Sequence, residues 1–136
     1  MATYTKFQCF VEDLAHRVHN FDSDTIKVAL SSTANAPSAS ADAVLADIAT
    51  IAAPAVDSVT LTKSSSGQTS GTYKYVPNDL TMTASGAVGP FQYVIIYNDT
   101  AANDPLICYF DYGAEVTLAS GDTFKLDFGD QLFSLA

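Results

Sequence analysis

The fold of this chain is decided by residues 89–113, which read Gly89-Pro90-Phe91-Gln92-Tyr93-Val94-Ile95-Ile96-Tyr97-Asn98-Asp99-Thr100 and, after a short polar connection, Pro105-Leu106-Ile107-Cys108-Tyr109-Phe110-Asp111-Tyr112-Gly113. Both runs are rich in β-branched and aromatic residues and are bounded by turn residues, which is typical of strands buried on both faces. The connection has the length that joins antiparallel neighbours. The sequence therefore predicts a central β-hairpin.

Shorter segments on both sides of this hairpin also have the pattern of strands. They cover residues 25–31, 56–62, 72–76, 80–84, 116–118, 123–128 and 131–135, with a last hairpin turn at 119–122. Turn residues separate them at intervals of about eight to twelve residues, as in a sandwich or barrel. We therefore expect one mainly β domain over residues 1–136, in which 25–136 form an antiparallel β-sandwich or barrel of about eight to nine short strands.

Residues 4–18 predict one N-terminal α-helix, with Thr5 able to cap its start. Apolar residues recur there at helical spacing, namely Phe7, Phe10, Val11, Leu14 and Val18. We expect this stripe to seal one face or end of the sheet, although the same stripe could dock on another subunit.

Two polar segments, residues 32–41 and 63–71, are expected to be surface loops, and the second is flexible by composition. Residues 43–50 fit either a short helical turn or an irregular edge strand, and the pattern leaves both open. Loops at the end of a sheet often carry contacts. The interface candidates are therefore the loop residues Asn35, Pro37, Ser65, Gly67 and Gln68 together with Phe7, Phe10 and Leu14 of the predicted helix.

The charge of the chain argues against a nucleic-acid partner. Six basic residues stand against fifteen acidic residues, so the net charge is −9, and such a surface repels phosphate backbones. Charged residues are only 15% of the chain, below the usual quarter, which favours burial against other subunits. We find no run of about twenty apolar residues and no secretion signal, so we expect no membrane partner and a protein that stays in the cytoplasm of the cell that makes it.

The residues with reactive side chains form no motif of known chemistry. His16 and His19 would share a helical face, but without a recognised third ligand we expect them to be solvated. A nucleophile elbow and a phosphate-binding glycine loop are both missing from the sequence. Cys9 and Cys108 are expected to be free thiols. We therefore expect that the protein has no catalytic residue, metal or cofactor and is not an enzyme.

The tyrosines of the central hairpin allow a second kind of function, because aromatic rings can stack on sugars. Alternation along the first strand would place Tyr93 and Tyr97 on one face with Phe91 and Ile95. Tyrosine rings that share a face with such apolar side chains are expected to belong to the core.

Short motifs along the whole chain carry a family resemblance. They are Val18-His19-Asn20-Phe21, Ser23-Asp24-Thr25-Ile26-Lys27-Val28-Ala29-Leu30, Val44-Leu45-Ala46-Asp47-Ile48, Ser70-Gly71-Thr72-Tyr73-Lys74, Thr83-Ala84-Ser85-Gly86, the central hairpin and Gly121-Asp122-Thr123-Phe124. In these motifs the chain resembles a family of small virion structural proteins that are encoded by tailed bacteriophages and prophages. The resemblance runs nearly end to end, and its most specific part is residues 89–100. Members tend to carry tryptophan beside the turn at residues 111–113, where this chain has Tyr109 and Phe110 and so keeps an aromatic core.

The resemblance implies a virion component that is made in the cytoplasm of a host bacterium. On this basis we expect a capsid decoration, or cement, protein on the outer surface of the head. Its partners would be the major capsid protein and copies of itself, in a homo-oligomer such as a trimer. One alternative is a tail or neck subunit, such as a tube, adaptor or fibre-associated protein. Another is a glycan-binding module on the virion surface, which rests on analogy with other β-sandwiches.

Overall fold

A computed structural model gives the structure of the protein and describes residues 2–136. These residues form ten strands, one α-helix and two short 3₁₀ helices, in the order β1 (Thr3–Lys6), α1 (Cys9–Ala15), β2 (Ile26–Ser31), η1 (Thr33–Asn35), η2 (Leu45–Asp47), β3 (Thr60–Leu61), β4 (Lys63–Thr69), β5 (Thr72–Pro77), β6 (Leu80–Thr83), β7 (Val88–Asn98), β8 (Leu106–Leu118), β9 (Thr123–Leu126) and β10 (Phe133–Leu135). The chain is therefore mainly β with antiparallel sheets and a helix near the N-terminus, as predicted, and the sheets do not close into a barrel.

The predicted central hairpin is confirmed as the middle of the largest sheet. That sheet has the strand order β1-β8-β7-β2-β3, so β7 is paired on both sides. Ile95 of β7 pairs with Ala29 of β2 on one side and with Tyr109 of β8 on the other. Every side chain of β7 from Val94 to Asn98 is buried, which fits a strand covered on both faces.

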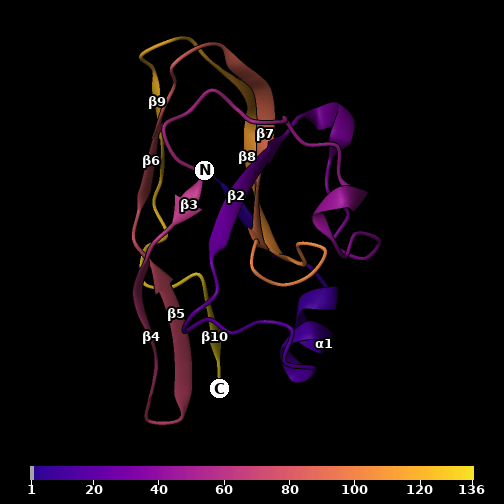
Figure 1. Cartoon of the computed structure of the whole chain (residues 1–136), viewed down its shortest axis with the longest axis vertical. Coiled ribbons are helices and arrows are strands. Elements are labelled where there is room, and N and C mark those ends of the chain that lie inside the picture. Colours follow the sequence, from indigo (N-terminus) through magenta and orange to yellow (C-terminus); the bar gives the residue numbers. More distant parts are fainter. Residues whose placement is uncertain (1) are drawn as a thin grey trace.

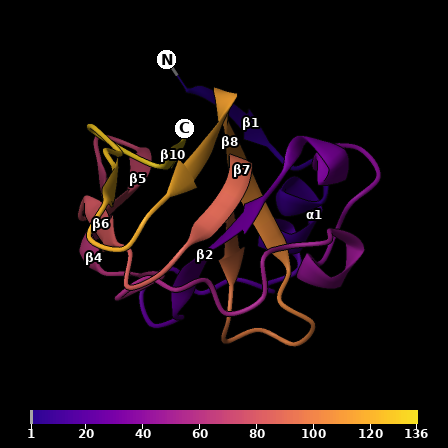
Figure 2. The same ribbon diagram turned by 90° about the horizontal axis from the view of Figure 1, so that it is seen from above.

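Two smaller sheets cover one face of this main sheet. One has the order β10-β5-β4 and the other pairs β6 with β9. Figure 2 shows the main sheet between these smaller sheets on one side and α1 with the segment that contains η1 and η2 on the other. The molecule is therefore an open sandwich with an additional layer of helix and loop.

The two faces of the main sheet bury two separate hydrophobic clusters. Val28 and Ile96 point into the larger cluster, between the sheets, where they meet residues such as Met82 of β6. Ala29 and Ile95, one position along each strand, belong to the smaller cluster on the opposite face. This alternation is the period of a strand, and complete burial of one such aliphatic side chain stabilises the fold by about 1.5–3 kcal/mol.

A β-bulge changes the face that Phe91 occupies. Alternation predicted Phe91, Tyr93, Ile95 and Tyr97 on one face, but the register between β7 and β8 shifts between Phe91 and Tyr93. From the Phe91–Val116 pair to the Tyr93–Asp111 pair, β7 advances two residues while β8 advances five, so the regular alternation of faces is interrupted there. As a result Phe91 lies in the larger cluster, whereas Ile95 and Tyr97 lie in the smaller one.

The prediction of one helix over residues 4–18 is wrong at both ends. Residues Thr3–Lys6 form β1, which pairs with β8, and the rings of Tyr4 and Phe110 pack 5.4 Å apart. The helix covers only Cys9–Ala15, and Thr5 does not cap it. Pairing with the edge of β8 therefore makes residues 3–6 a strand, although the apolar residues of this segment have helical spacing.

The prediction of a flexible loop over residues 63–71 is also wrong. Residues Lys63–Thr69 form β4, and Thr72–Pro77 form β5 as predicted. The paired positions of the two strands run from Lys63–Pro77 to Thr69–Thr72. A two-residue turn at Ser70 and Gly71, whose φ angles are 51° and 84°, joins the strands. Positive φ at both central residues matches the twist of a hairpin, so this turn pairs a segment whose composition alone indicates disorder.

Two smaller expectations also change, and one open alternative is decided. The strand predicted over 56–62 is reduced to β3 and an isolated bridge between Val56 and Ala84. The turn at 119–122 is present, but it connects two sheets because β9 pairs with β6 and not with β8. The undecided segment 43–50 contains a 3₁₀ turn, held by the Asp47 carboxylate, which accepts hydrogen bonds from the N–H groups of Ala43 and Val44.

Candidate functional site

The three predicted interface residues of the N-terminal segment do not form one exposed stripe. Phe7 and Phe10 are buried in the protein's own core, Phe7 in the smaller cluster and Phe10 in the larger one. Leu14 is half-buried and packs against the larger cluster. The N-terminal segment thus seals an end of the sandwich, and its two phenylalanines are not available for docking.

The predicted loop at residues 32–41 is ordered by contacts with its surroundings. Asn35 is exposed at the end of η1, but Pro37 is buried. Thr33 donates hydrogen bonds to the Glu115 carboxylate through its hydroxyl and its backbone N–H. Asn35 therefore remains on the surface as an interface candidate, whereas Pro37 does not.

The strands β4 and β5 form an arm that extends beyond the main sheet (Figure 1). The interface candidates Ser65, Gly67 and Gln68 lie in this arm and are all exposed. They come from β4, in which six of the seven residues are exposed. The structure thus brings together three of the eight predicted interface residues on one ordered element.

The outer side of β4 is an unpaired strand edge, because β4 is the last strand of its sheet. The residues flanking a two-residue turn form a hydrogen-bonded pair, and hydrogen-bonded and open pairs then alternate along the hairpin. Because Thr69 pairs with Thr72, the open pairs are those of Gln68 and Ser66. Their backbone N–H and C=O groups therefore point outward, and β4 carries one charge, at Lys63, and no proline.

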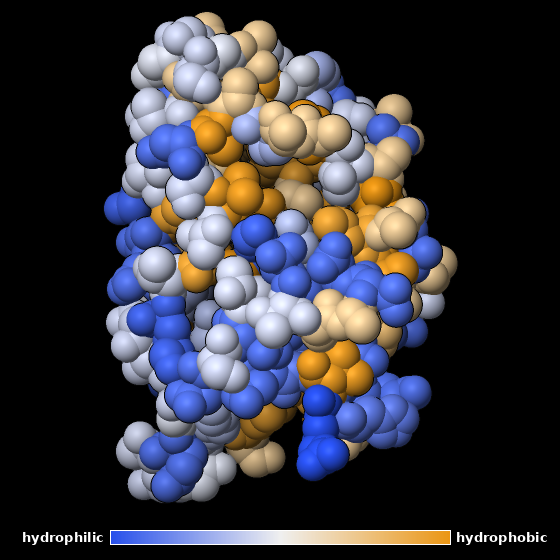
Figure 3. Space-filling view, in the orientation of Figure 1, coloured by the Kyte–Doolittle hydropathy of each residue, from blue (hydrophilic) through white to orange (hydrophobic). Residues whose placement is uncertain are grey.

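A second candidate is a groove between the end of α1 and the inner side of this arm, which we call the α1–β5 groove. It has a volume of about 650 Å³ and is lined by Leu14, Arg17, His19, Asn20, Phe21, Asp22, Ser66, Tyr73 and Leu135. Figure 3 shows a hollow at the lower end of the molecule, with hydrophobic atoms at its floor and hydrophilic atoms on both sides. The volume falls in the range of about 300–1,000 Å³ that is typical of ligand sites.

A buried polar network fixes the wall of the groove that contains His19. The Asn98 side-chain amide donates hydrogen bonds to His19 Nδ1 at 3.0 Å and to Asp24 Oδ2 at 2.7 Å. Because an amide nitrogen only donates, His19 is neutral and carries its proton on Nε2. That Nε2 atom is buried and has no hydrogen-bond partner among residues 2–136. Burial also lowers the pKa of His19 below its ordinary value.

The sequence predicted that His16 and His19 share one face of a helix, and this prediction is wrong. The helix ends at Ala15, His16 is exposed, and His19 is only 8% exposed. The rings of Phe10 and Phe21 lie 5.3 and 5.4 Å from the His19 ring. Sequence reasoning missed His19 because the early end of the helix turns it inward.

Charged residues stand at the rim of the groove. Arg17 forms no ion pair with any residue that the structure describes and adopts φ of 60°, a left-handed conformation. Lys63 Nζ lies 2.8 Å from Asp22 Oδ1, which ties the base of the arm to the loop after α1. The hydrogen bond from Lys63 also lowers the pKa of Asp22.

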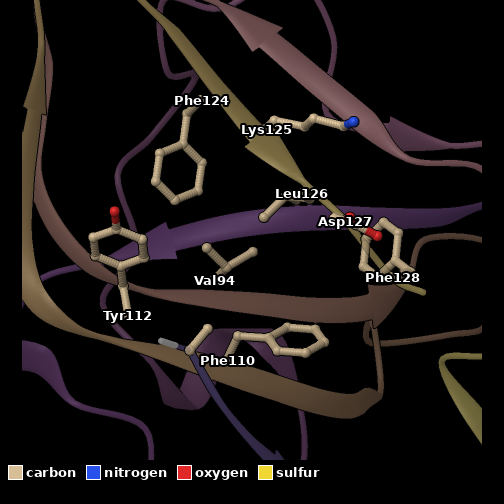
Figure 4. Close-up of a pocket in the computed structure, with 9 residues that line it drawn as sticks. Val94, Phe110, Tyr112, Phe124, Lys125, Leu126, Asp127 and Phe128 are labelled. Carbon is tan, nitrogen blue, oxygen red and sulfur yellow. The ribbon is translucent and has the colours of Figure 1, made fainter.

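A smaller apolar pocket lies at an open side of the sandwich, between β9 and the strands β7 and β8. In Figure 4 Phe124 and Leu126 of β9 point toward Val94 and Phe110, while Lys125 points away. The pocket has a volume of about 210 Å³, below the range of ligand sites. The ring of Tyr112 packs against Phe124 at 5.4 Å and narrows it. We regard it as a gap in the packing of the two layers.

The remaining reactive groups are dispersed. Within residues 2–136, no group of three or more histidine, cysteine, aspartate or glutamate residues could hold a metal ion. Cys9 and Cys108 are both free thiols, and burial raises the pKa of the Cys108 thiol. None of the helices in the described residues has the length and apolar character that crossing a lipid bilayer requires.

Comparison of the chain with protein-family models, with curated proteins and with solved structures found no match.

Proposed function

We propose that the protein is a structural subunit of a tailed-bacteriophage particle. More specifically, we propose a decoration protein that binds the outer surface of the head and bridges neighbouring major capsid subunits. The sequence resemblance to virion structural proteins supports the first statement. The β4–β5 arm, with its exposed and unpaired edge, supports the second.

The outer edge of β4 is the observation on which this proposal depends most. Exposed strand edges are usually protected in soluble proteins by charges, prolines or short length, because they can pair with another chain. The edge of β4 is seven residues long and carries only Lys63 as a charge. A partner strand added there would gain main-chain hydrogen bonds from Ser66 and Gln68, which is a common mode of recognition.

Repetition of such a contact would give a decoration protein its effect. One added strand contributes modest affinity, but contacts at symmetry-related sites on a shell act together. The net charge of −9 is compatible with an outer surface, which does not meet the packaged DNA.

The number of copies per particle tests this function. Purified particles would be analysed by quantitative mass spectrometry against the major capsid protein, and electron microscopy would locate the subunit. We expect hundreds of copies on the outside of the head. A handful of copies, or a closed ring at the neck or along the tail, would reject decoration and support the tail or neck alternative.

A further inference from the structure

The α1–β5 groove combines an apolar surface with a polar and charged rim. Its floor and one wall are apolar, formed by side chains that include Leu14, Phe21 and Tyr73. Its rim carries the amide of Asn20, the carboxylate of Asp22 and the guanidinium of Arg17. A ligand that fits must therefore present a flat C–H face on one side and several hydrogen-bonding groups on the other.

The polar groups at the rim have capacity to spare for a ligand. The Asn20 side-chain oxygen accepts a hydrogen bond from the Asp22 N–H, which leaves the Asn20 amide nitrogen free among the described residues. Lys63 engages Oδ1 of Asp22, which leaves Oδ2 available. Arg17 has no carboxylate partner in the part of the chain that the structure describes and offers a planar donor fork.

The aromatic wall is held in place by packing. The Tyr73 ring lies 5.9 Å from the Phe133 ring, and its hydroxyl shares a hydrogen bond of 2.6 Å with Ser66 Oγ. Both ends of the side chain are therefore fixed. A ring held in this way can contact a ligand with little loss of conformational entropy.

We propose that the α1–β5 groove binds a sugar that carries a carboxylate, such as a uronic acid residue of a polysaccharide. The Tyr73 ring packs against the C–H face of the sugar, and Asn20 and Asp22 bind its hydroxyl groups. Arg17 binds the carboxylate through a charge-assisted pair of hydrogen bonds.

Other classes of ligand fit less well. An inorganic anion would use Arg17 but would leave the apolar floor uncovered. A neutral sugar would leave the charge of Arg17 without a partner. This inference is independent of the place of the protein on a particle, since a groove on a single chain is sufficient for it.

The test is a titration of the full-length protein, ¹⁵N-labelled, with methyl glucuronide, methyl galacturonide, methyl glucoside and inorganic phosphate, followed by NMR. For the uronides we expect saturable shifts of the amides of Asn20, Phe21, Ser66 and Tyr73, with Kd of about 1 mM. The neutral glucoside should bind at least about tenfold more weakly, because it cannot pair with Arg17.

Two variants and two matched controls locate the site. We expect Tyr73→Ala and Arg17→Gln each to weaken uronide binding by about tenfold or more. Tyr112→Ala and Lys125→Gln change an exposed ring and an exposed cation outside the groove, and they should bind as the parent protein does. Heteronuclear spectra of each variant establish that it is folded.

Three results would overturn the inference. They are the absence of saturable shifts with every sugar, shifts confined to residues outside the groove, and equal binding of phosphate and uronide. Equal binding of the neutral glucoside would overturn the role given to Arg17 and with it the acidic character of the ligand.

Discussion

Arg17 occupies a backbone position that normally belongs to glycine. After α1 ends, the Val18 N–H donates to the Asp13 carbonyl and the Arg17 N–H donates to the Leu14 carbonyl, which is the Schellman pattern. Arg17 is the first residue after the C-cap residue of α1, His16, and it has φ of 60°. A side chain in that conformation costs about 1 kcal/mol. The apolar spacing over residues 4–18 predicted a longer helix, so this early helix end was not expected from the sequence.

Arg17→Gly is therefore expected to raise the free energy of unfolding by about 0.5–1 kcal/mol. Urea denaturation would measure the change. Arg17→Ala serves as the control, because it removes the same charge but keeps a Cβ atom, and it should leave stability nearly unchanged. A loss of stability in Arg17→Gly would contradict the explanation.

Gly89 is required by both its conformation and its surroundings. Its φ is +109°, and an added Cβ would lie 2.5 Å from the Val116 carbonyl oxygen. Both atoms belong to the β7–β8 ladder, so neither can move without disturbing the main sheet. We expect Gly89→Ala to lower the free energy of unfolding by about 3 kcal/mol or more.

Thermal and urea unfolding would measure that loss. Gly67→Ala is a matched control, since an added Cβ at Gly67 meets nothing within 4 Å and its φ is not positive. Similar effects of the two substitutions would show that the contact with Val116 is unimportant.

The environment of His19 predicts a dependence of stability on pH. Phe10 and Phe21 desolvate the ring, whereas Asp13 and Asp24 partly offset this effect, and the net result is a pKa below the ordinary 6.5. The unfolded chain then binds the proton more readily than the folded chain. Stability is therefore complete above pH 6.5 and falls as the pH decreases below that value.

A single proton can change stability by at most about 1.4 kcal/mol per pH unit. Urea denaturation of the parent protein between about pH 7.5 and pH 5 should show a decline, and His19→Gln should make it shallower. His16→Gln, at an exposed site outside the Asn98–His19 contact, serves as the matched control. A parent protein of constant stability over this range would contradict the prediction.

At the scale of elements, sequence pattern was sufficient for the central hairpin and for β2, β5 and β6. These strands have dense β-branched and aromatic residues, and their burial requires a definite register. It failed for β4, whose serines and glycine have no strong local preference. The Ser70–Gly71 turn was the available signal, because a two-residue turn of this kind pairs the segments on both sides.

The unpaired edge of β4 can be tested by a substitution that removes one backbone N–H. Gln68→Pro removes an outward N–H without removing a hydrogen bond to β5, because Gln68 belongs to an open pair. We expect this variant to fold but to bind purified particles at least about tenfold more weakly in a sedimentation assay. Gln68→Ala keeps the N–H and should bind normally. Equal binding of both variants would show that the edge is not the contact.

At the scale of the whole molecule, the fold class and three residues of the β4 site followed from the sequence, but the α1–β5 groove did not. The α1–β5 groove joins Arg17 and His19 to Tyr73, more than fifty positions away. Only the early end of α1 and the pairing of β5 with β10 bring these residues together. No local sequence pattern indicates that these distant residues lie together, whereas alternation and turn residues do indicate a strand.

The excess of acidic residues predicts an effect of salt on stability. The net charge of −9 makes the acidic side chains repel one another, and they lie closer together in the folded state than in the unfolded chain. The ion pairs Lys27–Asp99 and Lys125–Asp79 are partly exposed and therefore weak. Raising NaCl from about 10 mM to about 200 mM shortens the screening length from about 30 Å to below 10 Å. We expect the Tm to rise, as calorimetry would show. A lower Tm at the higher salt would mean that the ion pairs outweigh the repulsion.

The turn at Ser70 and Gly71 lies at the far tip of an arm whose two sides are held by their own ladder. An added Cβ at Gly71 meets no atom within 4 Å. A foreign peptide grafted between these two residues would extend into solvent without disturbing the hydrophobic clusters, so the tip is a natural position for displaying an epitope or a fluorescent tag.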